Sequence, residues 1–212
     1  MDDHALALCE LSNDLIYGKI PKDKLSYYVS NSLLAGEDAA KKYQGSDIFE
    51  LYRKNGIQIN YLEKSSEQFG VMLRGNIVLS GKGCSVELYR ESIRQLAAHS
   101  KTEDGAALNY DSALRIHLAH EFYHFLEYRE GSTISMRLNP VKTLDLKFYS
   151  RRAHVRRCEE VAAHAFAKEL LGLPVLPNYY DYLYLIDCGK LSRFKFETML
   201  ETNRKLLTSF ST

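Results

Sequence analysis

Residues 115–128 read RIHLAHEFYHFLEY, and this stretch constrains the chain more than any other. It holds three of the seven histidines of the chain and two glutamates in an otherwise apolar and aromatic run. His120, Glu121 and His124 within it spell the pattern H-E-x-x-H. The apolar spacing predicts a helix here, so two of the imidazoles share one helix face.

The spacing of this motif has a mechanical reason. Residues four apart on a helix lie about 40° apart round the axis, so two imidazoles at this spacing can converge on one ion. Glu121 lies about 100° round from His120, where its carboxylate can reach a water held on that ion. Zinc lowers the pKa of a bound water to about 7, so a carboxylate can take its proton at neutral pH. The simpler reading is two hydrogen-bonded histidines on a half-buried helix.

A catalytic zinc needs a third protein ligand, and a second helix predicted near residues 151–171 offers one. There the sequence RCEEVAAHAFAKELL places Glu159 and Glu160 at the start of an apolar stretch. A carboxylate among apolar side chains costs desolvation free energy unless it is paired or bound to a cation. Small alanines would let this helix approach a partner closely. The residues alone leave Glu159 and Glu160 both open as the third ligand.

The two helices together resemble the ImmA/IrrE family of gluzincin-type metallopeptidases. Besides H-E-x-x-H, the likeness rests on the pattern E-x-x-A-x-x-F-A-x-x-L-L followed by proline, which matches Glu160, Ala163, Phe166, Ala167, Leu170, Leu171 and Pro174. It covers about residues 57–175. The resemblance implies a zincin-like fold, Zn²⁺ bound by His120, His124 and Glu160, and Glu121 as general base. It also implies an intracellular enzyme of phage or mobile-element control that cleaves a helix-turn-helix repressor.

The chain departs from the family pattern at several places. Phe122 and Tyr123 stand where the family usually has a small residue and a glycine, and His164 stands where Asp or Asn is frequent. His164 and His117 are candidates for hydrogen bonding to the metal ligands, against the simpler reading of packed or exposed histidines. Residues 81–108 form an insertion before the motif helix, which we interpret as a lid or specificity element.

The rest of the sequence predicts helices on either side of a small sheet. Residues 3–54 read as short helices. The period changes to two over residues 57–80, which predicts three short antiparallel strands with a two-residue turn at Gly75-Asn76. A glycine-punctuated loop and a helix near residues 85–99 follow.

Further helices are predicted over residues 110–128, 151–171, 178–187 and 192–207. Asn178 and Asp181 read as a capping pair for the third of these. The order predicts an α+β fold with a small antiparallel sheet and extra terminal helices. We expect one zincin-like domain over residues 1–212, in which helical segments at residues 1–55 and 176–212 flank a catalytic core at residues 56–175.

Composition narrows the class of protein. The net charge of +1 gives no global electrostatic reason for binding nucleic acid or a membrane surface. The start MDDHALALCE lacks the pattern of a secretory signal, and no apolar run reaches the roughly 20 residues that span a bilayer. The four cysteines show no C-x-x-C spacing, which suits a reducing compartment. We therefore expect a cytoplasmic protein.

The leading hypothesis is a zinc endopeptidase whose protein substrate adds a strand to the sheet edge near residues 77–80. The alternative is a non-catalytic or weakly catalytic regulatory protein of a phage, mobile-element or toxin–antitoxin system that binds a partner repressor. Glu121 argues against the alternative, because binding alone needs no base. The run RRAHVRR at 151–157 reads as a solvated helix face, with an acidic substrate segment or nucleic acid as other readings.

Overall fold

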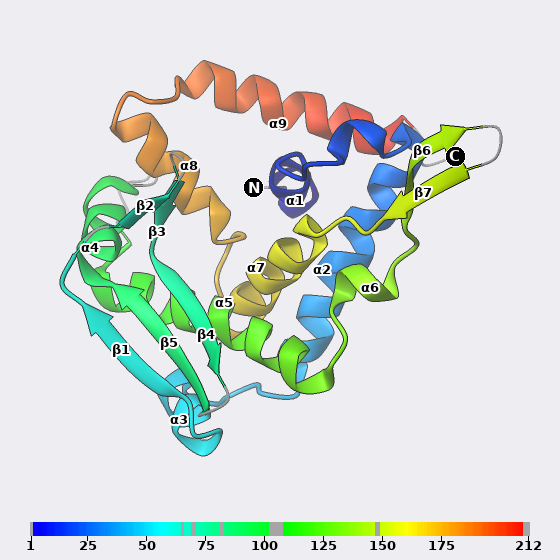
Figure 1. Ribbon diagram of the computed structural model, residues 1–212. Coiled ribbons are helices and arrows are strands. Elements are labelled where there is room, and N and C mark those ends of the chain that lie inside the picture. The colour runs from blue at the N-terminus through cyan, green and yellow to red at the C-terminus, as the bar shows by residue number, and fades with distance from the viewer. Residues whose placement is uncertain are drawn as a thin grey trace.

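The computed structural model describes residues 2–64, 66–68, 71–80, 83–101, 108–146 and 149–209. Its helices are α1 (Asp3–Leu11), α2 (Leu25–Lys41), α3 (Ile48–Lys54), α4 (Arg90–His99), α5 (Tyr110–Glu130), α6 (Ile134–Arg137), α7 (Arg157–Leu171), α8 (Asn178–Asp187) and α9 (Arg193–Thr208), with 3-10 turns η1 (Tyr17–Lys19) and η2 (Lys22–Lys24). Its strands are β1 (Gln58–Leu62), β2 (Ser66–Gln68), β3 (Val71–Leu73), β4 (Gly75–Ser80), β5 (Gly83–Tyr89), β6 (Val141–Leu146) and β7 (Tyr149–Ala153). The predicted α+β class is confirmed (Figure 1).

The sheet beside α5 has the strand order β1–β5–β4, and it is mixed rather than antiparallel. β4 pairs with β5 in antiparallel register, whereas β1 pairs with β5 in parallel, from Gln58 opposite Ser85 to Leu62 opposite Tyr89. The prediction of a purely antiparallel sheet is therefore wrong. β5 lies between β4 and β1, and it runs antiparallel to β4 but parallel to β1. The short strands β2 and β3 form a separate antiparallel pair.

The predicted turn at Gly75-Asn76 is also wrong. Both residues belong to β4, where they lie opposite Leu88 and Glu87 of β5. A glycine inside a strand often marks a close approach by another group. Here a Cβ atom at position 75 would lie 3.2 Å from both Cγ and Oε1 of Glu121. The glycine therefore makes space for Glu121 of the H-E-x-x-H motif, and it does not form a turn.

The stretch predicted as a loop and the start of a helix forms β5, and α4 begins only at Arg90. Val86 and Leu88 alternate with polar residues, and both are fully buried. This period of two is a strand signal, which the helical interpretation missed. Residues 83–99 thus belong to the framework of the fold, while other parts of the predicted insertion 81–108 lie outside the described residues.

The motif helix α5 forms close to where it was predicted. The side chain of Asn109 accepts a hydrogen bond from the backbone N–H of Ser112 at 2.7 Å, and Gly131 ends the helix in the left-handed conformation with φ of 65°. α5 packs against β4 and β5 on one side and against α7 on another. It therefore joins the sheet to the helical region of the molecule (Figure 1).

Helices α2 and α7 pack against each other at very short range. A Cβ atom at Gly36 of α2 would lie 2.1 Å from the carbonyl oxygen of Ala162 and 2.8 Å from the backbone nitrogen of Phe166. The close approach predicted for the alanine-rich helix is thus confirmed. It holds α7, which carries Glu159 and Glu160, in a fixed position relative to the core.

Helix α7 starts later than predicted, at Arg157. Residues 149–153 instead form β7, which pairs with β6 in a two-stranded antiparallel ribbon. The arginines at 151 and 152 therefore lie on a strand and not in the first turn of a helix, where they would oppose the helix dipole.

The predicted capping pair of α8 is not formed. Asn178 donates a side-chain hydrogen bond to the carbonyl oxygen of Leu6 at 3.0 Å, and Asp181 forms an ion pair with Arg74. Both side chains are used for tertiary contacts, which a local capping rule does not anticipate. α8 is nevertheless present with the predicted bounds.

Helix α1 lies inside the molecule, and α2, α7, α8 and α9 pack around it (Figure 1). Asp2 caps it by accepting hydrogen bonds from the backbone N–H groups of His4 and Ala5. Buried residues from both terminal helices and from the central region join one apolar cluster. None of the helices in the described portion of the chain has the length and apolar character of a membrane-spanning segment.

Candidate metal centre

The two histidines of the motif project from one face of α5 and meet a carboxylate from α7. His120 Nε2 lies 3.2 Å from His124 Nε2 and 3.2 Å from Glu160 Oε2. His124 Nε2 lies 3.8 Å from Glu160 Oε1. Among the described residues, these three side chains form a group that could hold a metal ion, with ligand atoms within 4.8 Å of one another.

The separations of these atoms suit a small divalent ion. Tetrahedral zinc with bonds of about 2.0–2.1 Å holds its ligand atoms roughly 3.3 Å apart. Two imidazole nitrogens and one carboxylate oxygen are also a donor set found at catalytic zinc sites. Three protein ligands leave a fourth tetrahedral position for water or substrate.

The structure separates the two candidates for the third ligand. Glu160 points to the histidines, whereas Glu159 accepts a hydrogen bond from the hydroxyl of Ser135. The two carboxylates are consecutive on α7, so their side chains leave the helix about 100° apart. Geometry thus places Glu160 with His120 and His124, and leaves Glu159 on the cleft wall.

Charge and burial shape the titration of this group. Burial alone would raise the pKa of Glu160, but the hydrogen bond with His120 and the nearby histidine charges outweigh it and hold that pKa far below its usual range. Burial would lower the pKa of His124, but its contact with Glu127 and the charges of Glu160 and Glu121 raise it to about 9. The negative charge around the site therefore favours a cation.

Glu121 lies in the same cleft as His120, His124 and Glu160 but is not part of that candidate ligand group. Its side chain is buried at 7% exposure, packs against Gly75 of β4 and lines the same cleft as the three ligands. β4 therefore sets its position from one side and α5 from the other. A carboxylate held in this way can accept a proton from a water at the open coordination position.

His164 and His117 also line this cleft. The His164 ring lies 4.9 Å from the His120 ring, centroid to centroid. Burial followed by the charge of His120 lowers the pKa of His164 to about 3, and burial followed by the charge of Arg74 lowers the pKa of His117 well below its usual value. Both rings are therefore neutral at neutral pH, and neither belongs to the ligand group found among the described residues.

Glu127 is a residue of this site that the sequence interpretation missed. It is 4% exposed, its Oε2 lies 3.7 Å from His124 Nδ1, and its Oε1 accepts a hydrogen bond from the backbone N–H of Ile134 at 2.6 Å. A carboxylate behind a ligating histidine fixes the tautomer and the orientation of the ring. The spacing of three residues after His124 on a helix is the signal that pointed to it.

The candidate ligand group lies in an open cleft of about 1090 Å³. Glu10 and Asp14 from the N-terminal segment contribute to its wall, where Glu10 pairs with Arg157 at 2.9 Å and Asp14 accepts a hydrogen bond from the Arg157 backbone N–H at 2.9 Å. A neighbouring cavity of about 490 Å³ shares Glu10, Arg74 and Arg157 with it. The N-terminal segment therefore forms part of the cleft wall, and its local sequence contains no pattern that predicts this contact.

Comparisons with known proteins identify no relative. No family model matches the chain, and neither a curated protein nor a solved structure matches it.

Proposed function

We propose that this chain is a zinc-dependent endopeptidase of the gluzincin type, similar to the ImmA/IrrE family. The observation that carries the proposal is the meeting of His120, His124 and Glu160 in an open cleft that Glu121 also lines. A metal site with a structural role alone would have no use for a buried carboxylate beside it. The desolvation free energy that Glu121 costs is more readily understood if that group handles a proton.

In this proposal His120, His124 and Glu160 hold the ion, and Glu127 orients His124. When bound, Zn²⁺ supplies a Lewis acid that acidifies the attacking water and polarises the scissile carbonyl. Glu121 takes the proton of that water and delivers it to the leaving amine. Gly75 leaves room for the buried Glu121 side chain, which lines the cleft.

The sheet edge beside the cleft favours a polypeptide substrate. β4 pairs with β5 along one side, and no described strand pairs with its other side. Asn76 and Ile77 of β4 line the metal cleft. An extended segment of substrate can therefore add to β4 and cross the metal centre. The family resemblance suggests that this substrate is a helix-turn-helix repressor.

Metal content and hydrolysis of β-casein by four purified proteins test the proposal. Wild type should bind about one Zn²⁺ and cut casein, and Glu121→Gln should bind zinc equally well but cut at least about a hundredfold more slowly. Glu160→Ala should lose the metal, whereas Glu159→Ala should keep it.

Wild type that binds no divalent metal would refute the site. A zinc-loaded wild type no more active than Glu121→Gln would favour instead the regulatory protein that binds a partner repressor without cutting it.

A further inference from the structure

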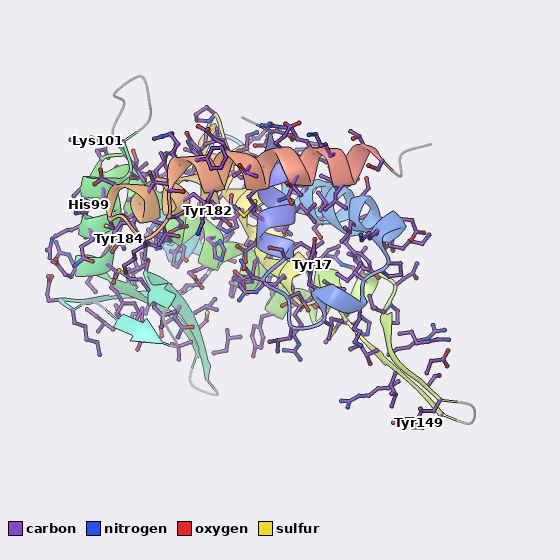
Figure 2. The ribbon with its side chains drawn as sticks, turned by 90° about the horizontal axis from the view of Figure 1, so that it is seen from above. Tyr17, His99, Lys101, Tyr149, Tyr182 and Tyr184 are labelled. Atoms are coloured by element: carbon purple, nitrogen blue, oxygen red, sulfur yellow. The ribbon has the colours of Figure 1, made fainter. Side chains whose placement is uncertain are left out.

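Strands β6 and β7 form a two-stranded ribbon that stands clear of the helical body. The two views agree on this, and Figure 2 shows Tyr149 at its far end, well away from the body (Figures 1 and 2). Among the described residues, neither strand pairs with a further strand. A two-stranded ribbon alone in water is only marginally stable. A partner that packed against such a ribbon would add to its stability.

One face of the ribbon is apolar. Leu146 lies opposite Tyr149, and Leu144 lies opposite Arg151. The intervening pair faces the other way, so these four side chains share a face. Leu144 is 42% exposed, Leu146 is 58% exposed and Tyr149 is 60% exposed. Three large apolar side chains on one small exposed face are typical of an interaction surface.

The ribbon also carries unbalanced positive charge. Lys142 pairs with Asp145 at 3.0 Å, which leaves the charges of Arg151 and Arg152 without an ion-pair partner among the described residues. Exposed Arg156 follows at the base of the ribbon, where it lines the metal cleft. Both the arm and the path from it to the cleft therefore favour acidic groups on whatever lies there.

The ribbon is continuous with the metal cleft. After β7 the chain passes through His154, whose Nδ1 lies 2.8 Å from the carbonyl oxygen of Ser135, and on to Arg157 of α7. Turn η1, which follows the exposed cleft residue Leu15, packs against β6. The wall of the cleft therefore adjoins the base of the ribbon.

We propose that the β6–β7 ribbon binds a segment of the protein substrate that lies outside the bond to be cut. This inference rests on the proposed function and deepens it. The segment is extended, pairs with a free ribbon edge and places apolar side chains on the face of Leu144, Leu146 and Tyr149. Its alternate, acidic side chains lie on the opposite face with Arg152, and an acidic residue at the end of its apolar stretch meets Arg151. The substrate class is thus a protein with an acidic and apolar segment flanking its cleavage site.

Two other occupants fit less well. A ribbon that enters a DNA groove reads bases with polar side chains, whereas three of the four side chains on this face are apolar. A second copy of the chain would bring its own Arg151 and Arg152 against these, and like charges at an interface are unfavourable.

Binding is measured first, without any need for cleavage. The probe is a fluorescein-labelled peptide of about ten residues with alternating leucine and glutamate, and its anisotropy is followed with zinc-loaded Glu121→Gln protein. In that background, two ribbon variants should each weaken binding about tenfold or more. One is the triple variant Leu144→Ser/Leu146→Ser/Tyr149→Ser, and the other is the double variant Arg151→Glu/Arg152→Glu.

Matched controls alter the same chemistry elsewhere. Phe194→Ser removes an exposed aromatic ring on α9, and Lys54→Glu/Lys195→Glu reverses two exposed charges on α3 and α9. Both should bind the peptide as the parent does. Equal binding by the ribbon variants and the controls would overturn the proposal, as would preferential binding of a DNA duplex or a dimer that dissociates in the ribbon variants.

Cleavage then connects the ribbon to catalysis. The ribbon variants, made in the active protein, should raise KM for β-casein about tenfold while cutting a short peptide taken from the first casein cleavage site as fast as wild type does. Unchanged KM for casein would overturn the ribbon's role. Wild type that cuts neither probe would refute the peptidase proposal, and the anisotropy result would still decide what the ribbon binds.

Discussion

Gly75 of β4 lies directly against Glu121 of α5, so that a Cβ atom at position 75 would come within 3.2 Å of Oε1. The same Cβ atom would lie 3.4 Å from Cδ2 of Leu88 on β5. The carboxylate is thus wedged between a helix and an edge strand, and a single hydrogen atom at Gly75 leaves it room. The position of the proposed base therefore depends on a residue that has no side chain and is not one of the proposed metal ligands.

Gly75→Ala should lower the rate of hydrolysis between about tenfold and a hundredfold, because a displacement of the base by a fraction of an ångström misaligns proton transfer. Zinc content should stay at the wild-type level, since the methyl group reaches Glu121 and not the ligands. Kinetics with the casein-derived peptide and metal analysis measure the two effects. Gly18→Ala is the control, because a Cβ atom there meets nothing within 4 Å. Full activity in Gly75→Ala would contradict the arrangement.

Glu127→Gln should weaken zinc binding about 10- to 100-fold, because a neutral amide supports the ligating form of His124 less well than a carboxylate does. The amide oxygen can still accept the hydrogen bond from Ile134, so the fold should be kept. Competition with a zinc chelator measures the affinity. Glu130→Gln, at an exposed position on the same helix, is the matched control. Equal affinities for the two variants would exclude an orienting role for Glu127.

Zinc affinity should rise with pH up to about 9, where the raised pKa of His124 lies in the metal-free protein. Below that pH the ion must displace a proton from His124, which costs about a factor of ten in affinity per pH unit.

The stability of the metal-free protein should change in the opposite direction. The raised pKa of His124 contributes stability that is fully present below its unfolded value of about 6.5 and is lost as pH rises towards 9. The rise in melting temperature that zinc produces should therefore grow from pH 6.5 through pH 7.5 to pH 8.5. A zinc-induced shift that is constant over this range would contradict the assignment.

Gly36→Ala should destabilise the fold by about 3 kcal/mol or more, because the added methyl group would overlap the backbone of α7 at Ala162. Alanine in the middle of an uncrowded helix would instead stabilise it by about 1 kcal/mol. The sign of the change in the free energy of unfolding therefore shows whether α2 and α7 are in close contact at Gly36. Urea denaturation measures it, and a gain in stability would show that α2 and α7 are farther apart.

The sequence predicted those parts of the fold and of the candidate site that depend on residues close together in the chain. His120 and His124 meet because helix geometry brings residues four apart onto one face, and Asn109 and Gly131 mark the ends of that helix by backbone rules. Glu160 needed more than the sequence. Its separation from Glu159 depends on how α7 packs, and α7 is fixed by the tight contact at Gly36.

The failures have physical causes as well. The alternation at Val86 and Leu88 is a strand signal, but it covers only two buried positions directly before a helix, so the predicted helix was extended over it. Gly75 fits both a turn and a close approach, and only the position of Glu121 decides between them. The pairing of Glu10 with Arg157 spans 147 residues, a distance at which no local pattern informs.

Helix α1 contributes Glu10 to the cleft wall while its own apolar residues lie in the core, and Asp2 at its start pairs with Arg204. A group joined ahead of Asp2 is therefore attached to a helix that reaches the wall of the candidate metal cleft. Expression and labelling schemes for this protein are safer when they leave that end untouched.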